Sequence, residues 1–396
     1  MTRLSATVTA PITAGMRALS LLQIGAGWFP EFCAGGENVF YHLAKHLPDA
    51  GVAVRGLVVG SADVCAQSAG RVCGFAPRSA PLATRLWRAR KAIVASFAAG
   101  APDLVATHLA LFALPALDKL GSRPLIVHFH GPWAAESAVE GAGWMSVGTK
   151  RAVERLVYNR ADRVIVLSRA FGEILRRAYG VDASRITVIP GGVDCERFAI
   201  GASPRAARER LGWDHDKRHI LAVRRLARRM GLPELISSMV EVRRKLPEAR
   251  LLIAGRGDQE GALRRLIQEL DLAESVQLLG FVPDDLLPWA YRAVDLTVVP
   301  STELEGFGLI TAESLAAGTP VLVTPVGGLP EAVCPLSPEL VLEGCAPADL
   351  ARGIIGALDG TRPLPTSDEC RSYARQRFDW PVIANRTREA YCSVLR

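Results

Sequence analysis

Short apolar segments rich in β-branched residues alternate with amphipathic helical segments along almost the whole chain. In the first half, strands are predicted over residues 18–25, 52–60, 103–108, 124–131, 162–168 and 185–190. In the second half, they are predicted over residues 219–226, 249–255, 275–280, 295–301, 320–325 and 339–344. Most are separated by helical patterns such as residues 37–47, whose apolar side chains fall on one face. This alternation predicts parallel sheets covered by helices on both sides.

A dozen strands are too many for one ordinary doubly wound sheet, so the pattern indicates two. Residues 190–198, PGGVDCERF, form a natural break between two sets of six strands. We therefore expect an α/β protein with two Rossmann-like lobes facing a central cleft, over residues 16–190 and 191–378. Such a cleft is the expected ligand site. Residues 1–15 show no hydrophobic period and are expected to form a disordered tail.

The composition excludes several classes of protein. Of the 396 residues, 49% are apolar and 22% are charged, which is typical of a globular protein. Eight scattered cysteines without a C-x-x-C pair indicate reduced thiols in a cytoplasmic protein, with no disulfide framework or zinc ribbon. The N-terminal segment lacks the apolar core of a signal peptide, and the longest apolar stretch is too short to cross a bilayer.

The formal net charge of +7 favours anionic partners, and it is concentrated in residues 82–97. On a helix, Arg85, Arg88 and Lys91 fall on one side and apolar residues on the other. One interpretation is peripheral contact with the inner face of a membrane. The preferred one is a surface helix whose apolar stripe packs on the core. A nucleic-acid partner is not expected, because the arginines of residues 224–229 lack interleaved aromatic residues.

One segment of the second half carries the strongest chemical signal. Glu305 follows a predicted strand and precedes G-F-G and a helix expected over about residues 309–317. Gly306 and Gly308 let the backbone approach a ligand, and the helix N-terminus favours an anion such as a diphosphate. Glu305 and Glu313 can accept hydrogen bonds from a sugar and from a ribose. Each glutamate has a simpler explanation, one as a carboxylate that favours the helix dipole and the other as a solvated surface residue. These explanations do not account for the two glycines between the glutamates or for the strand before them.

This segment resembles a known family. Residues 303–331, ELEGFGLITAESLAAGTPVLVTPVGGLPE, match the E-x7-E signature of retaining GT-B glycosyltransferases of the glycosyltransferase family 4 type. The resemblance covers nearly all of the chain from Met16. Its other parts are a glycine loop and helix (34–47), an interlobe segment (188–198), a base-pocket region (279–301) and the final helices (377–395).

The resemblance implies a hexosyltransferase that moves a sugar from a nucleoside-diphosphate sugar to an acceptor with retention of anomeric configuration. The first lobe would hold the acceptor, a saccharide, a lipid-linked chain or a glycolipid, as in polysaccharide or glycolipid biosynthesis. The second lobe would hold the donor, and residues 379–396 would cross back to the first lobe. The sequence shows no carboxylate cluster arranged for a divalent metal, so we expect neither a metal nor a cofactor.

The same resemblance implies a donor site assembled from both lobes. Glu305 would contact the donor sugar as a catalytic residue, and Glu313 would bind the ribose. Gly35 and Gly36 would approach the diphosphate from the first lobe. The remaining donor contacts would be Gly306, Phe307, Gly308 and Leu309 for the sugar and phosphate, and Gly255, Arg256, Phe281 and Val282 for the base.

A histidine adds a candidate from the first lobe. His130 precedes Gly131 at the carboxyl end of a predicted strand, where ligands of such sheets bind. The family often keeps a histidine there, so we expect His130 to act near the reacting sugar as a catalytic residue. His128 lies on the same face and is expected to serve ordinary polar packing.

The cations of the site are less regular. Family members usually place lysine before the glycine of RRLARRMG, and this chain has Met230 there. We expect Arg225 and Arg229 to share the diphosphate as catalytic cations, with Met230 packed aside. The alternative that Arg228 and Arg229 are solvated loop charges stays open.

Three motifs imitate other sites, and two other functions stay open. In IGAGWFP, Pro30 stands where a dinucleotide fingerprint needs glycine. His42 and His46 have metal-pair spacing but no third ligand, so a solvated helix face is expected. The D-H-D of residues 214–216 is expected to be a turn.

A sugar-nucleotide epimerase or phosphorylase of GT-B fold is one alternative function. A catalytically silent GT-B scaffold is the other, and Met230 keeps it open.

Overall fold

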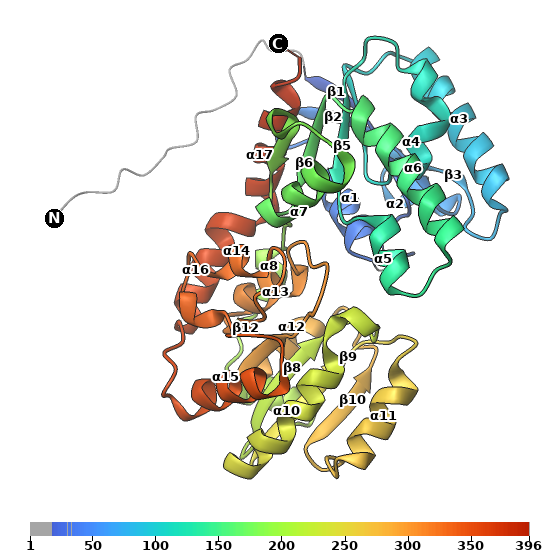
Figure 1. Cartoon of the computed structure of the whole chain (residues 1–396). Helices are drawn as coiled ribbons and strands as arrows, with labels where there is room; N and C mark the ends of the chain where they lie inside the picture. The colour runs from blue at the N-terminus through green and yellow to red at the C-terminus, as the bar shows by residue number, and fades with distance from the viewer. Residues whose placement is uncertain (1–17, 30, 33, 396) are drawn as a thin grey trace.

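The computed structural model describes residues 18–29, 31–32 and 34–395 of the chain. It forms two lobes, each with a parallel sheet and flanking helices (Figure 1). This is the α/β architecture predicted from the sequence. The predicted tail, residues 1–15, lies outside the described residues.

The first lobe contains a seven-stranded sheet in the order β3-β2-β1-β4-β5-β6-β7. Its strands are β1 (Leu19–Gly25), β2 (Val52–Val59), β3 (Val72–Ala76), β4 (Leu104–Thr107), β5 (Leu125–Phe129), β6 (Arg163–Val166) and β7 (Ile186–Val188). Its helices are α1 (Gly35–His46), α2 (Asp63–Gln67), α3 (Leu82–Ala98), α4 (Ala110–Ala113), α5 (Trp133–Val139), α6 (Trp144–Arg160) and α7 (Arg169–Ile174). Shorter helical turns are η1 (Leu114–Lys119), η2 (Leu175–Tyr179) and η3 (Ala183–Arg185). The strand order reverses between β1 and β4, and ligands of such sheets bind at this reversal.

The second lobe contains a five-stranded sheet in the order β10-β9-β8-β11-β12. Its strands are β8 (Arg218–Val223), β9 (Ala249–Ala254), β10 (Val276–Gly280), β11 (Leu296–Val299) and β12 (Val321–Val323). The helices are α8 (Cys195–Phe198), α9 (Pro204–Leu211), α10 (Leu232–Lys245), α11 (Glu260–Glu269), α12 (Leu287–Ala293), α13 (Leu309–Ala317), α14 (Leu329–Val333), α15 (Pro347–Asp359) and α16 (Ser367–Phe378), with the turns η4 (Arg228–Met230) and η5 (Pro338–Leu340). The last helix of the chain, α17 (Trp380–Cys392), follows α16. The helix predicted over residues 309–317 is confirmed as α13.

The predicted division into two sets of six strands is wrong at two places. Residues 339–344 form one isolated bridge, Val323 to Val341, next to η5. The Arg362 guanidinium donates to the carbonyl oxygen of Val341 at 2.7 Å, so a side chain satisfies this backbone where a ladder was expected. Strand β3 was not predicted because it is a short edge strand that pairs only with β2. Its Gly74 packs against the backbone, since a Cβ there would lie 2.5 Å from the oxygen of Ser61.

The last helix, α17, returns to the first lobe and packs against α1 (Figure 1). Trp380 and Tyr391 of α17 are buried in the same apolar cluster as Phe40 of α1. His42 stacks on Trp380 with ring centroids 4.7 Å apart, and its burial lowers the His42 pKa to about 3. The expected solvated face for His42 is therefore wrong, because a helix distant in sequence covers it.

Helix α3 keeps some apolar surface in contact with solvent. Its Ile93 is buried in the core, as the preferred interpretation expects, and Arg88 and Lys91 are exposed. However, Trp87 is 62% exposed on the outer face, with the Lys91 ammonium 5.5 Å from its ring centroid. Leu82 and Val94 are also exposed. In the described part of the chain, no helix is long and apolar enough to span a bilayer.

Candidate active site

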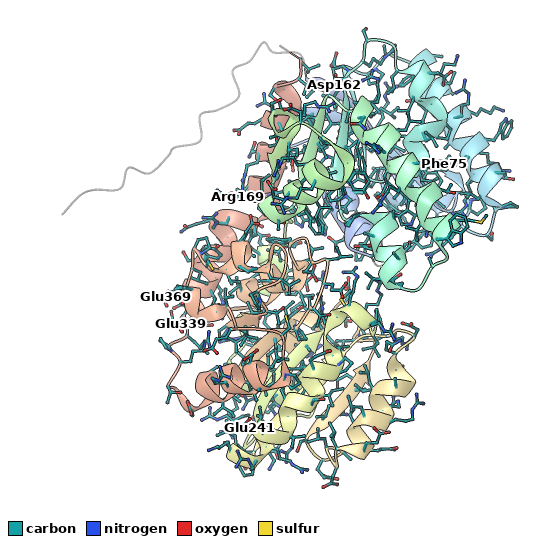
Figure 2. The ribbon with its side chains drawn as sticks, viewed as in Figure 1. Phe75, Asp162, Arg169, Glu241, Glu339 and Glu369 are labelled. Atoms are coloured by element: carbon teal, nitrogen blue, oxygen red, sulfur yellow. The ribbon has the colours of Figure 1, made fainter. Side chains whose placement is uncertain are left out.

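The segments that follow β1 and β6 in the first lobe meet the segments that follow β11 and β12 in the second. A Cβ atom on Gly35 would lie 3.7 Å from Cδ1 of Leu309, and one on Gly306 would lie 2.5 Å from the ring of Phe171. Arg169, labelled in Figure 2 where the lobes meet, donates its backbone N–H to Glu331 at 2.9 Å. The cleft therefore brings the predicted glycine loop against the predicted signature helix.

Glu305 lies in the loop between β11 and α13, and one of its carboxylate oxygens is held by protein groups. The Nη2 atom of Arg224 donates to its Oε2. The Oγ atom of Ser301 also donates to Oε2, at 3.0 Å. Arg224 and Glu305 are both shielded, with 7% and 13% of their side chains exposed. Arg224 was not among the residues predicted for the site.

The charge state of Glu305 results from competing effects. Burial raises its pKa, because desolvation penalises a carboxylate. The positive charge of Arg224, hydrogen bonds from Arg224 and Ser301, and the charge of Arg229 outweigh that burial. The net direction is a lowered pKa, so Glu305 is a carboxylate at neutral pH.

The loop between Glu305 and α13 is shaped by close backbone contacts. Gly308 has φ +69°, a left-handed conformation that favours glycine, and it starts α13. Gly327 also has a positive φ, and a Cβ there would lie 2.0 Å from the carbonyl oxygen of Glu305. Phe307 is 2% exposed and its side chain packs in the apolar core of the second lobe. The α13 N-terminus thus presents backbone N–H groups beside Glu305.

Glu313 lies one turn further along α13. The Tyr291 hydroxyl donates to its Oε2 at 2.8 Å. Burial raises the Glu313 pKa, although this hydrogen bond and the charge of Arg197 oppose the shift. The tyrosine therefore fixes one oxygen of Glu313, as Arg224 and Ser301 fix one oxygen of Glu305.

The four residues predicted to surround the base lie together at the ends of β9 and β10. The backbone N–H of Gly255 donates to the carbonyl oxygen of Gly280 at 2.7 Å, which joins the two strand ends. The Arg256 guanidinium lies 5.8 Å from the centroid of the Phe281 ring. Phe281 is 54% exposed, so its ring is available to a planar ligand, and Val282 follows it.

The two predicted diphosphate cations both contact the first lobe. The Arg229 Nη2 atom lies 3.3 Å from Oε1 of Glu136, and its Nη1 donates to the carbonyl oxygen of Leu304 at 3.0 Å. The Arg225 Nη2 atom lies 2.9 Å from Oε1 of Glu140. Met230 is 6% exposed and packs in the apolar core of the second lobe. A diphosphate role for either arginine remains a prediction.

His130 belongs to a stack of three histidines that the sequence showed only in part. Its Nε2 forms a 2.9 Å hydrogen bond with Nδ1 of His108, and Nε2 of His108 forms one of 2.8 Å with Gln23. The rings of His108 and His128 stack with centroids 4.3 Å apart. Burial lowers the pKa of His130 to about 4, and burial also lowers that of His108. A Cβ on Gly36 would lie 3.3 Å from Cδ2 of His130, which places the stack behind the glycine loop.

Three site residues were missed, and each had a weak signal. Arg224 directly follows β8, and Arg225 is the next residue. The sequence does not indicate which of these two arginines lies beside Glu305. Glu136 follows the H-x-H-G segment and lies beside Gly131, where a Cβ would be 2.6 Å from its carboxylate. His108 is the last residue of the strand predicted over residues 103–108, and its neighbours on both sides are mostly apolar. Within the described ranges, no group of three or more histidine, cysteine, aspartate or glutamate side chains is arranged to hold a metal ion.

Comparisons with known proteins agree with this geometry. A family model described as Glycosyltransferase Family 4 matches residues 34–197, and one described as Glycosyl transferases group 1 matches residues 204–377. The glycogen synthase of Mycobacterium tuberculosis (strain ATCC 25618 / H37Rv) is 31% identical over 306 residues, which cover 74% of this chain and 70% of that relative. This chain belongs to glycosyltransferase family 4. The family recognised in the E-x7-E segment is thereby confirmed.

Two further similarities describe the extent and the fold of this family member. D-inositol 3-phosphate glycosyltransferase 2 of Catenulispora acidiphila is 34% identical over 278 residues, and the match covers 68% of this chain but only 65% of that relative. The structure of HepE from Anabaena in complex with UDP-glucose has a TM-score of 0.76 and 22% identity, and the match covers 95% of this chain and 100% of HepE. The predicted GT-B fold is confirmed.

Proposed function

We propose that this chain transfers a hexose from a nucleoside-diphosphate sugar to a hydroxyl group of a carbohydrate or lipid-linked acceptor, with retention of anomeric configuration. The observation that carries the proposal is the pair of carboxylates on either side of the α13 N-terminus. Glu305 and Glu313 each have Oε2 held by protein donors, at the cleft edge of the second lobe. The helix N-terminus between them suits a diphosphate. A sugar, a diphosphate and a ribose fit these three positions in that order.

The relatives support the donor class. HepE has been solved in complex with UDP-glucose. A relative in Mycolicibacterium smegmatis, 30% identical over 284 residues, is named a GDP-mannose-dependent mannosyltransferase acting on a phosphatidylinositol monomannoside. Both names point to a nucleoside-diphosphate hexose, and the second favours a glycolipid acceptor. For this chain, the base and the acceptor remain part of the proposal.

The residues of the cleft can supply the chemistry without a metal. As the bond from sugar to diphosphate breaks, negative charge grows on the leaving diphosphate. Fixed cations and helix N–H groups lower the energy of that state because they are oriented in advance. In the proposal, Arg225, Arg229 and the α13 N-terminus supply this charge, while Glu305 orients the sugar and His130 lies behind it.

A donor screen tests the proposal. Purified protein is mixed with UDP-, GDP- and ADP-hexoses and candidate acceptors, and release of nucleoside diphosphate is followed with and without EDTA. We expect transfer with at least one donor, unaffected by the chelator, and a product whose anomeric configuration matches the donor by NMR. Activity that EDTA abolishes and manganese restores would contradict the metal-free site. Inversion of the anomeric centre would contradict retention.

A silent scaffold is the second candidate, and Met230 favours it. A buried methionine replaces a cation that family members usually carry at this position. The scaffold predicts nucleotide binding without turnover for every donor and acceptor. Donor hydrolysis or transfer in the same screen would exclude it.

Peripheral membrane contact through residues 82–97 belongs to the same proposal. Trp87 and Lys91 are both exposed on one side of α3, and a tryptophan next to a cation suits the interface of an anionic bilayer. Such contact would bring a lipid-linked acceptor close to the cleft.

A further inference from the structure

A buried arginine, Arg224, lies beside Glu305 and has no role in the site predicted from the sequence. We propose that Arg224 is a positioning residue that holds Glu305 as a carboxylate, with Oε2 fixed and Oε1 presented to the donor sugar. The inference rests on the proposed transfer reaction and deepens it. It assigns to Arg224 a direct contact with Glu305, whereas the contacts of Arg225 and Arg229 are with Glu140 and Glu136.

The two hydrogen bonds to Glu305 arrive at the same oxygen. Arg224 Nη2 and Ser301 Oγ both donate to Oε2, and Arg224 Nη2 also contacts the Ser301 oxygen. Within the described chain, Oε1 accepts no hydrogen bond from a protein group. A carboxylate with one oxygen held and the other open can accept a hydroxyl hydrogen without first reorganising.

The backbone around this contact is fixed on both sides. The Arg224 N–H donates to the carbonyl oxygen of Ala254 at 2.8 Å, and a Cβ on Gly255 would lie 1.9 Å from the Arg224 oxygen. The carbonyl oxygen of Ser301 accepts a hydrogen bond from the Thr324 hydroxyl at 2.6 Å. Arg224 and Ser301 therefore hold Glu305 from two loops, each of which is anchored by a hydrogen bond of its own backbone.

Alternation of side chains after β8 separates the two neighbouring arginines. Successive residues of extended chain point in opposite directions. Arg224 points into the lobe and has 7% of its side chain exposed, whereas Arg225 points outward and has 55% exposed. The two cations thus have different partners, Glu305 and Glu140. A buried carboxylate needs a close cation to stay ionised, and Arg224 is the arginine in contact with it.

The first test removes the charge of Arg224 and then restores it. Arg224→Gln is expected to lower kcat about 10- to 100-fold near neutral pH, the usual effect of losing a hydrogen bond to a charged group. Because Glu305 would then bind a proton more readily, the acid limb of the kcat–pH profile should move to higher pH. Arg224→Lys should return the limb close to its wild-type position. Affinity for free UDP or GDP, measured by calorimetry, should stay within about threefold.

Two outcomes of this test would overturn the inference. One is an acid limb that does not move in Arg224→Gln. The other is a loss of UDP and GDP affinity that matches the loss of kcat, because that result would make Arg224 a direct diphosphate ligand. Arg228→Ala is the matched control, since Arg228 is an exposed arginine of the same loop and should leave both measurements unchanged.

A second test does not require activity. Urea unfolding of Arg224→Gln, Glu305→Gln and the double variant forms a thermodynamic cycle. Arg224→Gln should destabilise the fold, and Glu305→Gln in the same chain should restore part of that loss, because it removes the unpaired buried charge. Strictly additive effects would overturn the inference. If the donor screen finds no transfer but the cycle shows coupling, the proposed function is wrong and the pairing of Arg224 with Glu305 still holds.

Discussion

Arg229 in the second lobe and Glu136 in the first form an ion pair across the cleft, with 3.3 Å between Nη2 and Oε1. Burial raises the Glu136 pKa, and the charges of Arg229 and Arg225 oppose that shift. Glu136 also lies against Gly131, directly after His130. Glu136 of the first lobe is therefore paired with Arg229, the cation that a donor diphosphate is predicted to need.

Glu136→Gln should increase the affinity for a free nucleoside diphosphate. The diphosphate would no longer compete with a carboxylate for Arg229, and a partly exposed ion pair of this kind is worth about 0.2–1 kcal/mol. Calorimetry with UDP and GDP should show roughly a two- to fivefold tighter complex. Unchanged or weaker binding would show that Glu136 does not compete with the diphosphate.

Arg225→Ala and Arg229→Ala should each reduce turnover. Each variant removes a cation predicted to stabilise the leaving diphosphate, at a cost of roughly 2–4 kcal/mol in the transition state. Steady-state kinetics with the donor found in the screen measure this, and Arg228→Ala serves as the control. If Arg229→Ala keeps near wild-type turnover while Arg225→Ala loses it, Arg229 does not replace the lysine. Full activity in both would place the diphosphate elsewhere.

Glu305→Ala and Glu313→Ala should fail in different ways. Glu305 is predicted to face the sugar, so its loss should reduce kcat and leave the affinity for free nucleoside diphosphate nearly unchanged. Glu313 is predicted to bind the ribose, so its loss should weaken that affinity by roughly 1–3 kcal/mol. Calorimetry and kinetics on both variants decide between these roles. Equal losses of affinity in the two variants count against the assignment.

The buried histidine stack should make stability depend on pH. Burial lowers the His130 pKa to about 4, whereas an unfolded histidine titrates near 6.5. Between these values the unfolded chain binds more protons, so the free energy of unfolding should fall as pH drops, by up to about 1.4 kcal/mol per pH unit for this group. Urea unfolding between about pH 7 and pH 5 should show a smaller drop for His130→Gln than for wild type.

The exposed His215 provides a control for this prediction. His215→Gln removes a histidine that lies outside the stack, so it shows how much of any change comes from losing a histidine elsewhere in the chain. A wild-type dependence in His130→Gln would show that His130 is not held neutral by burial.

The exposed face of α3 should contribute to binding of anionic vesicles. Trp87→Ala combined with Lys91→Ala removes an interfacial ring and a cation, so co-sedimentation with phosphatidylglycerol vesicles should fall. Transfer to a water-soluble acceptor should stay unchanged, because neither residue lies in the cleft. The matched control is Val240→Ala, which alters an exposed apolar residue of the second lobe. Equal binding by all three proteins would remove residues 82–97 as a contact site.

Much of the fold was determined by the sequence on its own. Hydrophobic period placed the α13 helix and most of the strands, because local burial on one or two faces leaves a direct pattern in the letters. The sequence also placed Glu305 before α13 and Glu313 within it, as the structure has them, because both belong to one strand–loop–helix unit whose geometry is local. The sequence did not predict β3, because a short edge strand has too few buried positions to show a hydrophobic period.

The tertiary structure alone decided which distant residues meet. His42 has the letters of a surface helix, yet α17 covers it, more than 300 positions later in the chain. Arg224 and Arg225 are adjacent and chemically identical, and only the direction of the backbone after β8 turns one toward Glu305 and the other toward Glu140. The pairing of Arg229 with Glu136 depends on how the two lobes face each other. Such contacts join segments far apart in sequence, so no local pattern encodes them, and the packing of the lobes determines which charges are paired.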